Sequence, residues 1–210
     1  MRIGIKICGL TEPAGLDACL EYGADWVGFN FFARSPRYVT TTQAAQLIRR
    51  IEAAPVQPGR VGLFVNPTDE QIAETLDNVS LDILQLYTTP ERAQVIRQKF
   101  GLPVWLSVAV STQNDLPTTA LADRFVIESR PPEGATRPGG NGLAFPWHLT
   151  RAWQAPASWM LAGGLRPETV AQAIRESAAN AVDVASGVES TPGVKDPDAI
   201  AHFIAAARAV

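Results

Sequence analysis

Hydrophobic runs alternate with helical stretches along the whole length of this chain. The runs are short and rich in β-branched and aromatic residues, as buried strands are. We expect strands at Ile3–Cys8, Trp26–Phe32, Val61–Val65, Ile83–Tyr87, Val104–Val110, Phe125–Glu128, Trp159–Ala162 and Ala181–Ala185. We expect helices at Pro13–Tyr22, Thr42–Ala53, Thr68–Asn78, Pro90–Phe100, Phe145–Gln154, Pro167–Ser177 and Pro197–Ala209, and a weaker one near Leu116–Ala122. The alternation predicts an α/β fold, a single-domain (β/α)₈ TIM barrel over residues 1–210.

A doubly wound open sheet is the alternative fold for a strand–helix alternation. Such sheets commonly carry a glycine-rich dinucleotide turn after the first strand. The first turn here reads KICGLTEP, which lacks that pattern. The barrel is therefore favoured.

The two faces of the predicted strands differ in polarity. Ile3, Ile5 and Ile7 share one face of the first strand, and alternation puts Lys6 and Cys8 on the other. Because the apolar faces pack under the helices, the opposite faces line the barrel interior. That interior then holds Lys6, Cys8, Asn30, Gln85, Tyr87, Glu128 and Asp183. Burying unpaired charge is costly, so this polar interior indicates a functional site, in which we expect Lys6 to form an ion pair with Asp183.

Composition narrows the class of protein. The 210 residues are 46% hydrophobic and 19% charged, the balance of a folded globular protein, and the net charge of −3 does not suggest a nucleic-acid or membrane partner. No apolar run is long enough for a membrane span, and MRIGIKICGL does not resemble a signal peptide, so we expect a cytoplasmic protein. Two cysteines and two histidines disfavour disulfide frameworks and metal sites, since His148 and His202 fall in or near helices.

Several motifs occur together in a specific order. They are KICGLT, YGADWVGFNFFARSPRYV, RVGLFVN, QLYTTPE, RPGGNGLAFPW, LAGGLRPETV and AVDVASGVESTPGVKD. The ordered set resembles the phosphoribosylanthranilate isomerase family of tryptophan biosynthesis, whose members are (β/α)₈ barrels. The resemblance runs from Lys6 to about Asp196.

The resemblance implies an Amadori rearrangement of N-(5′-phosphoribosyl)anthranilate without metal or organic cofactor. A general acid opens the sugar ring, and a general base removes the C2′ proton of the resulting iminium. Cys8 matches the family's base, although a buried, inert thiol is the ordinary role of a free cysteine. Glu128 matches the position of the family's acid, which is an aspartate. Its extra methylene moves the carboxyl by about 1.5 Å, and a carboxylate merely paired with Lys6 or Arg130 is the alternative.

The sequence departs from the family pattern at two further positions. QLYT replaces QLHG, which puts Tyr87 where the family has histidine. FPW replaces FDW, so Pro146 stands in place of an acidic residue. Both departures bear on substrate and loop contacts.

Two glycine-containing strand ends are expected to hold the substrate phosphate. Gly163 and Gly164 end the seventh strand, and Ser186 and Gly187 follow the eighth. Loops seven and eight are the usual phosphate site of such barrels, because glycine lets backbone N–H groups approach phosphate oxygens.

The remaining substrate contacts come from the resemblance. Arg37 matches the arginine that binds the anthranilate carboxylate, and Asp183 matches an aspartate that contacts the substrate. Gly139, Gly140 and Gly142 lie in a long loop that we expect to cover the site, with a surface insertion as the alternative. The resemblance leaves monomer and homodimer both open.

Two other functions remain open at this point. A diverged phosphosugar isomerase with an altered aglycone pocket would account for Tyr87, Glu128 and Pro146. A non-catalytic barrel that binds a phosphorylated ligand would need only the phosphate loops.

Overall fold

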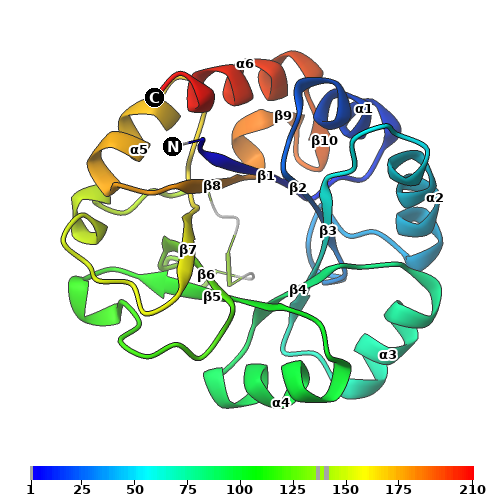
Figure 1. Ribbon diagram of the computed structural model, residues 1–210, viewed down its shortest axis with the longest axis horizontal. Helices are drawn as coiled ribbons and strands as arrows, with labels where there is room; N and C mark the ends of the chain where they lie inside the picture. The colour runs from blue at the N-terminus through cyan, green and yellow to red at the C-terminus, as the bar shows by residue number, and fades with distance from the viewer. Residues whose placement is uncertain (1, 136–137, 140–141) are drawn as a thin grey trace.

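Eight parallel strands form a closed barrel inside a ring of helices, as the computed structural model shows for residues 2–135, 138–139 and 142–210 (Figure 1). The strands are β1 (Gly4–Cys8), β2 (Trp26–Asn30), β3 (Gly59–Val65), β4 (Ile83–Tyr87), β5 (Val104–Val110), β6 (Arg124–Ser129), β7 (Ser158–Leu161) and β8 (Ala181–Val184). They pair in chain order, and β8 closes the barrel against β1. The predicted (β/α)₈ architecture is thereby confirmed.

Within the described ranges the ring contains fewer regular helices than the alternation predicts. The α-helices are α1 (Pro13–Tyr22), α2 (Thr41–Glu52), α3 (Asp69–Asn78), α4 (Pro90–Phe100), α5 (Val170–Ser177) and α6 (Pro197–Arg208). Local caps account for several of the starts. The side chains of Thr40 and Thr68 each close a capping box with the glutamine three residues on, and Pro197 occupies the first turn of α6 behind the N-cap Asp196.

The predicted helices after β5 and β6 are wrong. The chain has only a 3₁₀ turn at Gln113–Asp115 (η1) and no helix over 116–122; it has another 3₁₀ turn at Trp147–Thr150 (η2) in place of Phe145–Gln154. Pro117 and the β-branched threonines that follow it disfavour an α-helix in the first segment. In the second, Pro146 precedes the turn and Pro156 soon follows it, so little length is left for a helix. The ring in Figure 1 accordingly shows loops beside β5, β6 and β7.

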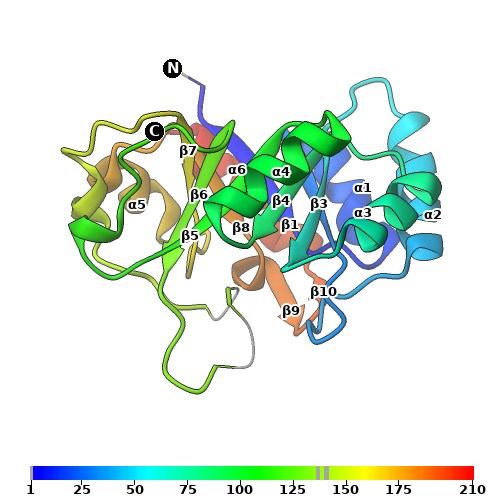
Figure 2. The same ribbon diagram turned by 90° about the horizontal axis from the view of Figure 1, so that it is seen from below.

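A small hairpin after β8 is an element that the strand–helix pattern missed. A 3₁₀ turn, η3 (Ser186–Val188), leads into the antiparallel strands β9 (Glu189–Thr191) and β10 (Val194–Lys195). Figure 2 shows the hairpin at the same end of the barrel as the loop that follows β6. This is the end at which the parallel strands finish, where sites form in this architecture.

The two faces of the strands separate as the alternation predicts. Ile5, Ile7 and Val182 are fully buried in the apolar layer beneath the helices. The polar residues of the opposite face, Lys6, Cys8, Asn30, Gln85, Glu128 and Asp183, are also buried, and Tyr87 is half-buried. Among the described residues, no helix is long and apolar enough to cross a membrane.

Candidate active site

A cavity lies at the carboxyl ends of the strands. Side chains from β1, β2, β3, β4, β6 and β8 line it, together with the loops after β2, β6, β7 and β8. The lining includes all but one of the residues expected in the site: Cys8, Arg37, Glu128, Gly139, Gly142, Gly163, Gly164, Asp183, Ser186 and Gly187. The exception, Gly140, lies outside the described residues.

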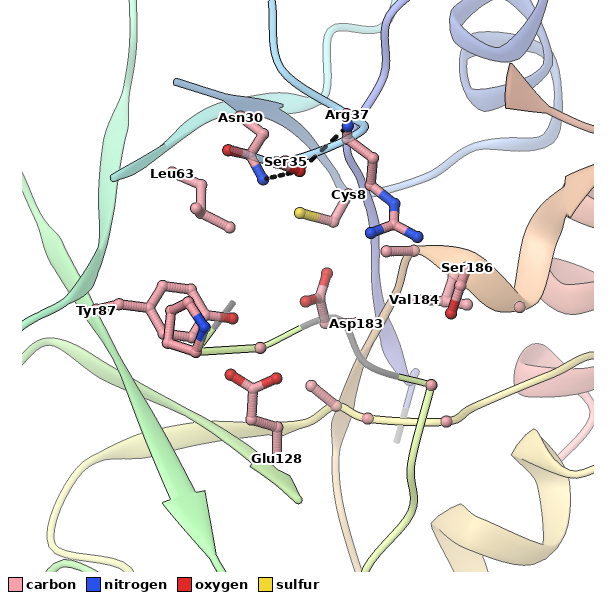
Figure 3. A pocket seen from close by; sticks show the side chains of 18 of the residues that line it. Cys8, Asn30, Ser35, Arg37, Leu63, Tyr87, Glu128, Asp183, Val184 and Ser186 are labelled. Atoms are coloured by element: carbon pink, nitrogen blue, oxygen red, sulfur yellow. Dashed lines mark hydrogen bonds between the residues drawn. The ribbon is translucent and has the colours of Figure 1, made fainter. Parts of the chain in front are cut away.

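Cys8 and Glu128 enter the cavity from opposite sides. Figure 3 shows the Cys8 sulfur and the Glu128 carboxyl group pointing toward the centre, with the Asp183 carboxyl group between them. Both side chains are buried. A small substrate between them would therefore have a thiol on one side and a carboxyl group on the other.

Lys6 and Asp183 form an ion pair beneath Cys8. Lys6 Nζ donates to Asp183 Oδ1 at 2.8 Å, and the lysine side chain is completely buried. Burial alone lowers the pKa of Lys6, but the charges of Asp183 and Cys8 outweigh it, so the pKa lies above its ordinary value. The ion pair expected from strand parity is thereby confirmed. Register explains it, because Lys6 and Asp183 are direct neighbours on β1 and β8.

Gly28 leaves room for the Cys8 side chain, and two opposing effects act on the pKa of its thiol. A Cβ on Gly28, its neighbour on β2, would lie 3.0 Å from the sulfur and 3.2 Å from Lys6 Nζ, so glycine there leaves room for both side chains. Burial raises the pKa of Cys8, while the positive charges of Lys6 and Lys195 act against that rise. The pKa stays above its usual value, so the resting residue is a neutral thiol at neutral pH.

Arg37 is held in place by a buried acidic partner that strand patterning did not reveal. Its Nε and Nη2 donate to the two carboxylate oxygens of Glu189 at 2.6 and 2.9 Å. Lys195 Nζ donates to the same carboxylate at 2.8 Å and to the carbonyl of Ala185 at 2.9 Å. Burial raises the pKa of Glu189, but the hydrogen bond from Arg37 and the charges of both cations lower it to below its usual range. The β9–β10 hairpin thus fixes Arg37 and the loop after β8 together.

Tyr87 and Glu128 lie under the loop that follows β6. Burial raises the pKa of Tyr87 well above its usual value, and the charge and hydrogen bond of Glu128 raise it further. A Cβ on Gly139 would lie 2.5 and 2.6 Å from the two Glu128 carboxylate oxygens and would also overlap the Tyr87 hydroxyl. Gly139 therefore packs directly on this pair, and a larger residue cannot take its place without displacing them. Arg130, the alternative partner considered for Glu128, pairs with Asp115 instead, at 2.8 Å.

The glycines after β7 meet the other end of the same loop. Gly163 and Gly164 have φ angles of 84° and 66°, which favour glycine. A Cβ on Gly163 would lie 2.9 Å from the Leu143 carbonyl, and one on Gly164 would lie 2.8 Å from the Ala144 nitrogen. A Cβ on Gly187 would overlap the Leu165 carbonyl. The loops after β6, β7 and β8 can approach one another this closely because these positions lack side chains.

Metal-binding side chains do not gather in the described part of the chain. No group of three or more His, Cys, Asp or Glu residues there is arranged to hold an ion. His148 lies in η2 and His202 in α6, both away from the cavity.

The fold and the residues at the strand ends define a (β/α)₈-barrel enzyme. The family model described as N-(5′-phosphoribosyl)anthranilate (PRA) isomerase matches residues 5–206. The N-(5′-phosphoribosyl)anthranilate isomerase of Paramagnetospirillum magneticum is 49% identical over 99% of this chain and 98% of its own. The chain therefore belongs to the phosphoribosylanthranilate isomerase family.

Solved structures agree with this assignment. A phosphoribosylanthranilate isomerase in complex with reduced 1-(o-carboxyphenylamino)-1-deoxyribulose 5-phosphate superposes with a TM-score of 0.82 at 31% identity, covering 99% of this chain and 100% of that one. Monomers generated from the dimeric enzyme of Thermotoga maritima superpose with a TM-score of 0.81 at 31% identity, with the same coverage.

Proposed function

We propose that this cavity converts N-(5′-phosphoribosyl)anthranilate into 1-(2-carboxyphenylamino)-1-deoxyribulose 5-phosphate, with Glu128 as the general acid and Cys8 as the general base. The chain is an isomerase of the tryptophan biosynthesis family, an intramolecular oxidoreductase. The observation that supports the two roles is the placement of the Cys8 sulfur and the Glu128 carboxyl group on opposite sides of one cavity (Figure 3).

The reaction begins with ring opening. Glu128 gives its proton to the furanose ring oxygen, the bond from that oxygen to C1′ breaks, and the nitrogen lone pair forms a C1′=N iminium. The Cys8 thiol gives its proton to water, and the resulting thiolate removes the C2′ proton. The electrons of that C–H bond form C1′=C2′ while the nitrogen becomes neutral. The resulting enol gains a proton at C1′ and loses its hydroxyl proton at C2′, which gives the ketone. Each positioned acid or base contributes roughly 10²–10⁴-fold.

Cys8 becomes a base only once the substrate is charged. Burial raises the pKa of Cys8, so the thiolate is scarce in the empty site. An iminium beside the sulfur adds a positive charge, which favours the thiolate and acidifies the C2′ proton at the same time. The charge of Lys6 lowers the pKa of Cys8, but burial outweighs it and the charge of Asp183, which pairs with Lys6 at 2.8 Å, opposes it. The base is thus activated by the first half-reaction.

Arg37 and Asp183 position the rest of the substrate in this proposal. Glu189 takes the Nε and Nη2 donors of Arg37, which leaves the Nη1 edge for the anthranilate carboxylate. Asp183 keeps one carboxylate oxygen, Oδ2, that Lys6 does not occupy, for a sugar hydroxyl or the anthranilate amine. Both side chains line the cavity.

The phosphate lies between the loops after β7 and β8. Gly163 and Gly164 bring backbone N–H groups to the cavity wall, and Ser186 and Gly187 face them from the start of η3. Backbone N–H groups clustered in this way bind oxyanions without a cationic side chain.

The loop after β6 opens to admit the substrate. The free space within the cavity is about 60 Å³, well below the roughly 300–1,000 Å³ of typical ligand pockets. Pro138, Gly139 and Gly142 lie across it. We assign the loop a covering role, in which Gly139 packs on Glu128 and shields the reacting groups from water.

The reaction belongs in a reducing compartment. Cys8 and Cys19 are both free and buried, and the proposed base must remain a thiol. We therefore assign the protein to the cytoplasm, with the phosphoribosyl anthranilate named above as its small-molecule substrate. Both a monomer and a homodimer are compatible with it.

Loss of the fluorescence of phosphoribosylanthranilate on incubation with the purified protein tests the activity. We expect turnover well above the uncatalysed rate, and its absence would sink the proposal. Glu128→Ala should lower kcat by roughly 10²–10⁴-fold while inorganic phosphate still binds. If Glu128→Ala retains full activity, the acid has been assigned to the wrong residue.

A further inference from the structure

The opposite end of the barrel, where the strands begin, is closed by aromatic rings. Trp26 on β2 and Trp105 on β5 meet edge to face, with ring centres 5.3 Å apart. Trp26 fits because both neighbouring strands carry glycine. A Cβ on Gly4 or Gly59 would lie 2.8 or 2.6 Å from the indole.

Arg124, the first residue of β6, lies against both indoles. Its guanidinium carbon is 4.5 Å from the Trp26 ring centre and 4.8 Å from the Trp105 ring centre. Such stacking stabilises a guanidinium that has lost part of its water. Alternation on β6 puts Arg124 on the same face as Glu128, so one strand carries a charged group at each end of the barrel interior.

A cleft of about 370 Å³ opens beside this stack. The charged residues that line it are Arg2, Arg124, Arg208 and Asp25. Arg2 and Arg208 both pair with Asp25, at 3.1 and 2.7 Å. Asp25 also accepts from the Ile5 backbone nitrogen at 2.8 Å. Three guanidinium groups therefore face a single, fully engaged carboxylate, which leaves a surplus of two positive charges in the cleft.

Arg124 lacks an anionic partner in the described part of the protein. No carboxylate there forms an ion pair with it, and its Nη1 is buried without a hydrogen-bond acceptor. A charged donor that is buried and unsatisfied is more costly than a neutral one, and cation–π stacking provides no acceptor. Arg124 lines the cleft, so an anion bound there would supply the counter-charge that the described residues do not.

We propose that this cleft is an oxyanion site, in which Arg124 and Arg2 bind a small phosphate or carboxylate group and Arg208 adds positive charge. The site lies at the opposite end of the barrel from Cys8 and Glu128, so it can be occupied while the substrate cavity is full. Planar guanidinium groups suit an oxyanion, because they can present two parallel donors to it. Arg208 adds positive charge but no free donor pair, since its Nη1 and Nη2 already donate to Ile3, Gly23 and Asp25.

Isothermal titration with inorganic phosphate tests the proposal when the substrate cavity is first saturated with reduced 1-(o-carboxyphenylamino)-1-deoxyribulose 5-phosphate. We expect the saturated protein to bind one further phosphate. Arg124→Met, which keeps an apolar stem against the indoles, should weaken that binding at least tenfold. Arg151→Met is the matched control, since Arg151 is exposed and lies outside the cleft, and it should change nothing.

Two results would overturn the site: no phosphate binding to the saturated protein, or equal affinity in the wild type and Arg124→Met. If circular dichroism shows that Arg124→Met is unfolded, Arg2→Gln replaces it. The Arg2 side chain is 69% exposed, so its loss should leave the fold intact and weaken phosphate binding several-fold. A parallel titration with malonate distinguishes the two sources, because displacement of phosphate by malonate identifies a site that also accepts carboxylates.

Discussion

The two cysteines of this chain lie in two buried regions of opposite chemistry. Cys8 is at the end of β1, inside the barrel, where it faces Lys6 and a cavity. Cys19 is in α1, in the apolar layer between the helices and the strands. Their exposed fractions are 4% and 0%, both are free thiols, and burial raises the pKa of each. Burial alone therefore does not separate a reactive cysteine from an inert one.

What separates them is the layer in which each lies. The interior layer contains paired charged groups: Lys6 pairs with Asp183, and Arg37 and Lys195 both pair with Glu189. Replacing such buried pairs with hydrophobic residues often leaves stability unchanged or increases it. Their presence at the strand ends is explained by the chemistry of the cavity, whereas the outer layer is explained by packing.

The largest expected effect comes from replacing each of the two cysteines by alanine in turn. Cys8→Ala removes the proposed base and should lower kcat by about 10²–10⁴-fold, with little change in stability. Cys19→Ala removes only packing and should leave kcat unchanged while lowering the free energy of unfolding by about 1 kcal/mol. Steady-state kinetics and urea unfolding of both variants check this, and equal activity of the two variants would contradict the proposed role of Cys8.

The second effect concerns the ion cluster behind Arg37. Glu189→Gln leaves Arg37 and Lys195 buried beside a neutral amide, and breaking a buried charge cluster in this way costs about 3–5 kcal/mol of stability. Arg37 should also lose its fixed orientation, so KM should rise more than kcat falls. Asp115→Asn is the control, because its partner Arg130 is exposed. A lowered kcat at unchanged KM would show that Glu189 acts on the reaction and not on the position of Arg37.

A third effect tests the length of the acid. In the structure the Glu128 carboxylate reaches Tyr87 and the backbone of Gly139. Glu128→Asp withdraws it by about 1.5 Å, and a misplacement of that size can cost about 10²-fold in rate. We expect kcat to fall by about that factor in the steady-state assay. A rate gain would show that the longer carboxylate is a handicap in this cavity.

The sequence predicted the barrel and its inward-facing strand residues because both depend on local regularities, whereas Arg37 was expected only from the family resemblance. Strand parity alone placed Lys6 beside Asp183, since neighbouring parallel strands align their inward residues. The short β9–β10 hairpin was missed, because strands of three and two residues give too little alternation to be recognised. With it the pattern missed the role of Glu189, whose partner Arg37 is more than a hundred residues away in sequence.

The two wrong helix predictions, after β5 and β6, have a different cause. The segments after β5 and β6 contain apolar residues at helix-compatible spacing, but prolines interrupt them and tertiary packing determines their path. Trp153, for example, packs against Phe125 and Trp159 from a non-helical segment. Hydrophobic spacing in these segments is thus produced by side-chain packing and does not determine a helical backbone.

The smallest expected effect returns to Cys19 and uses pH. Burial raises the pKa of Cys19 to about 12, against an ordinary value of 9.0. A folded-state pKa above the unfolded one contributes stability that is complete below about pH 9 and is lost as the pH rises toward 12. At pH 10 the loss should be about 1.4 kcal/mol relative to pH 8, since each pKa unit has that value. Urea unfolding at both pH values measures this loss of the free energy of unfolding. In Cys19→Ala the loss between pH 8 and pH 10 should be smaller than in the wild type by this amount.

Cys8 contributes in the same direction, because burial also raises its pKa. Comparing Cys8→Ala with Cys19→Ala therefore separates the contributions of the two thiols. An alkaline loss that neither substitution reduces would mean that both thiols ionise as readily in the folded state as in the unfolded chain.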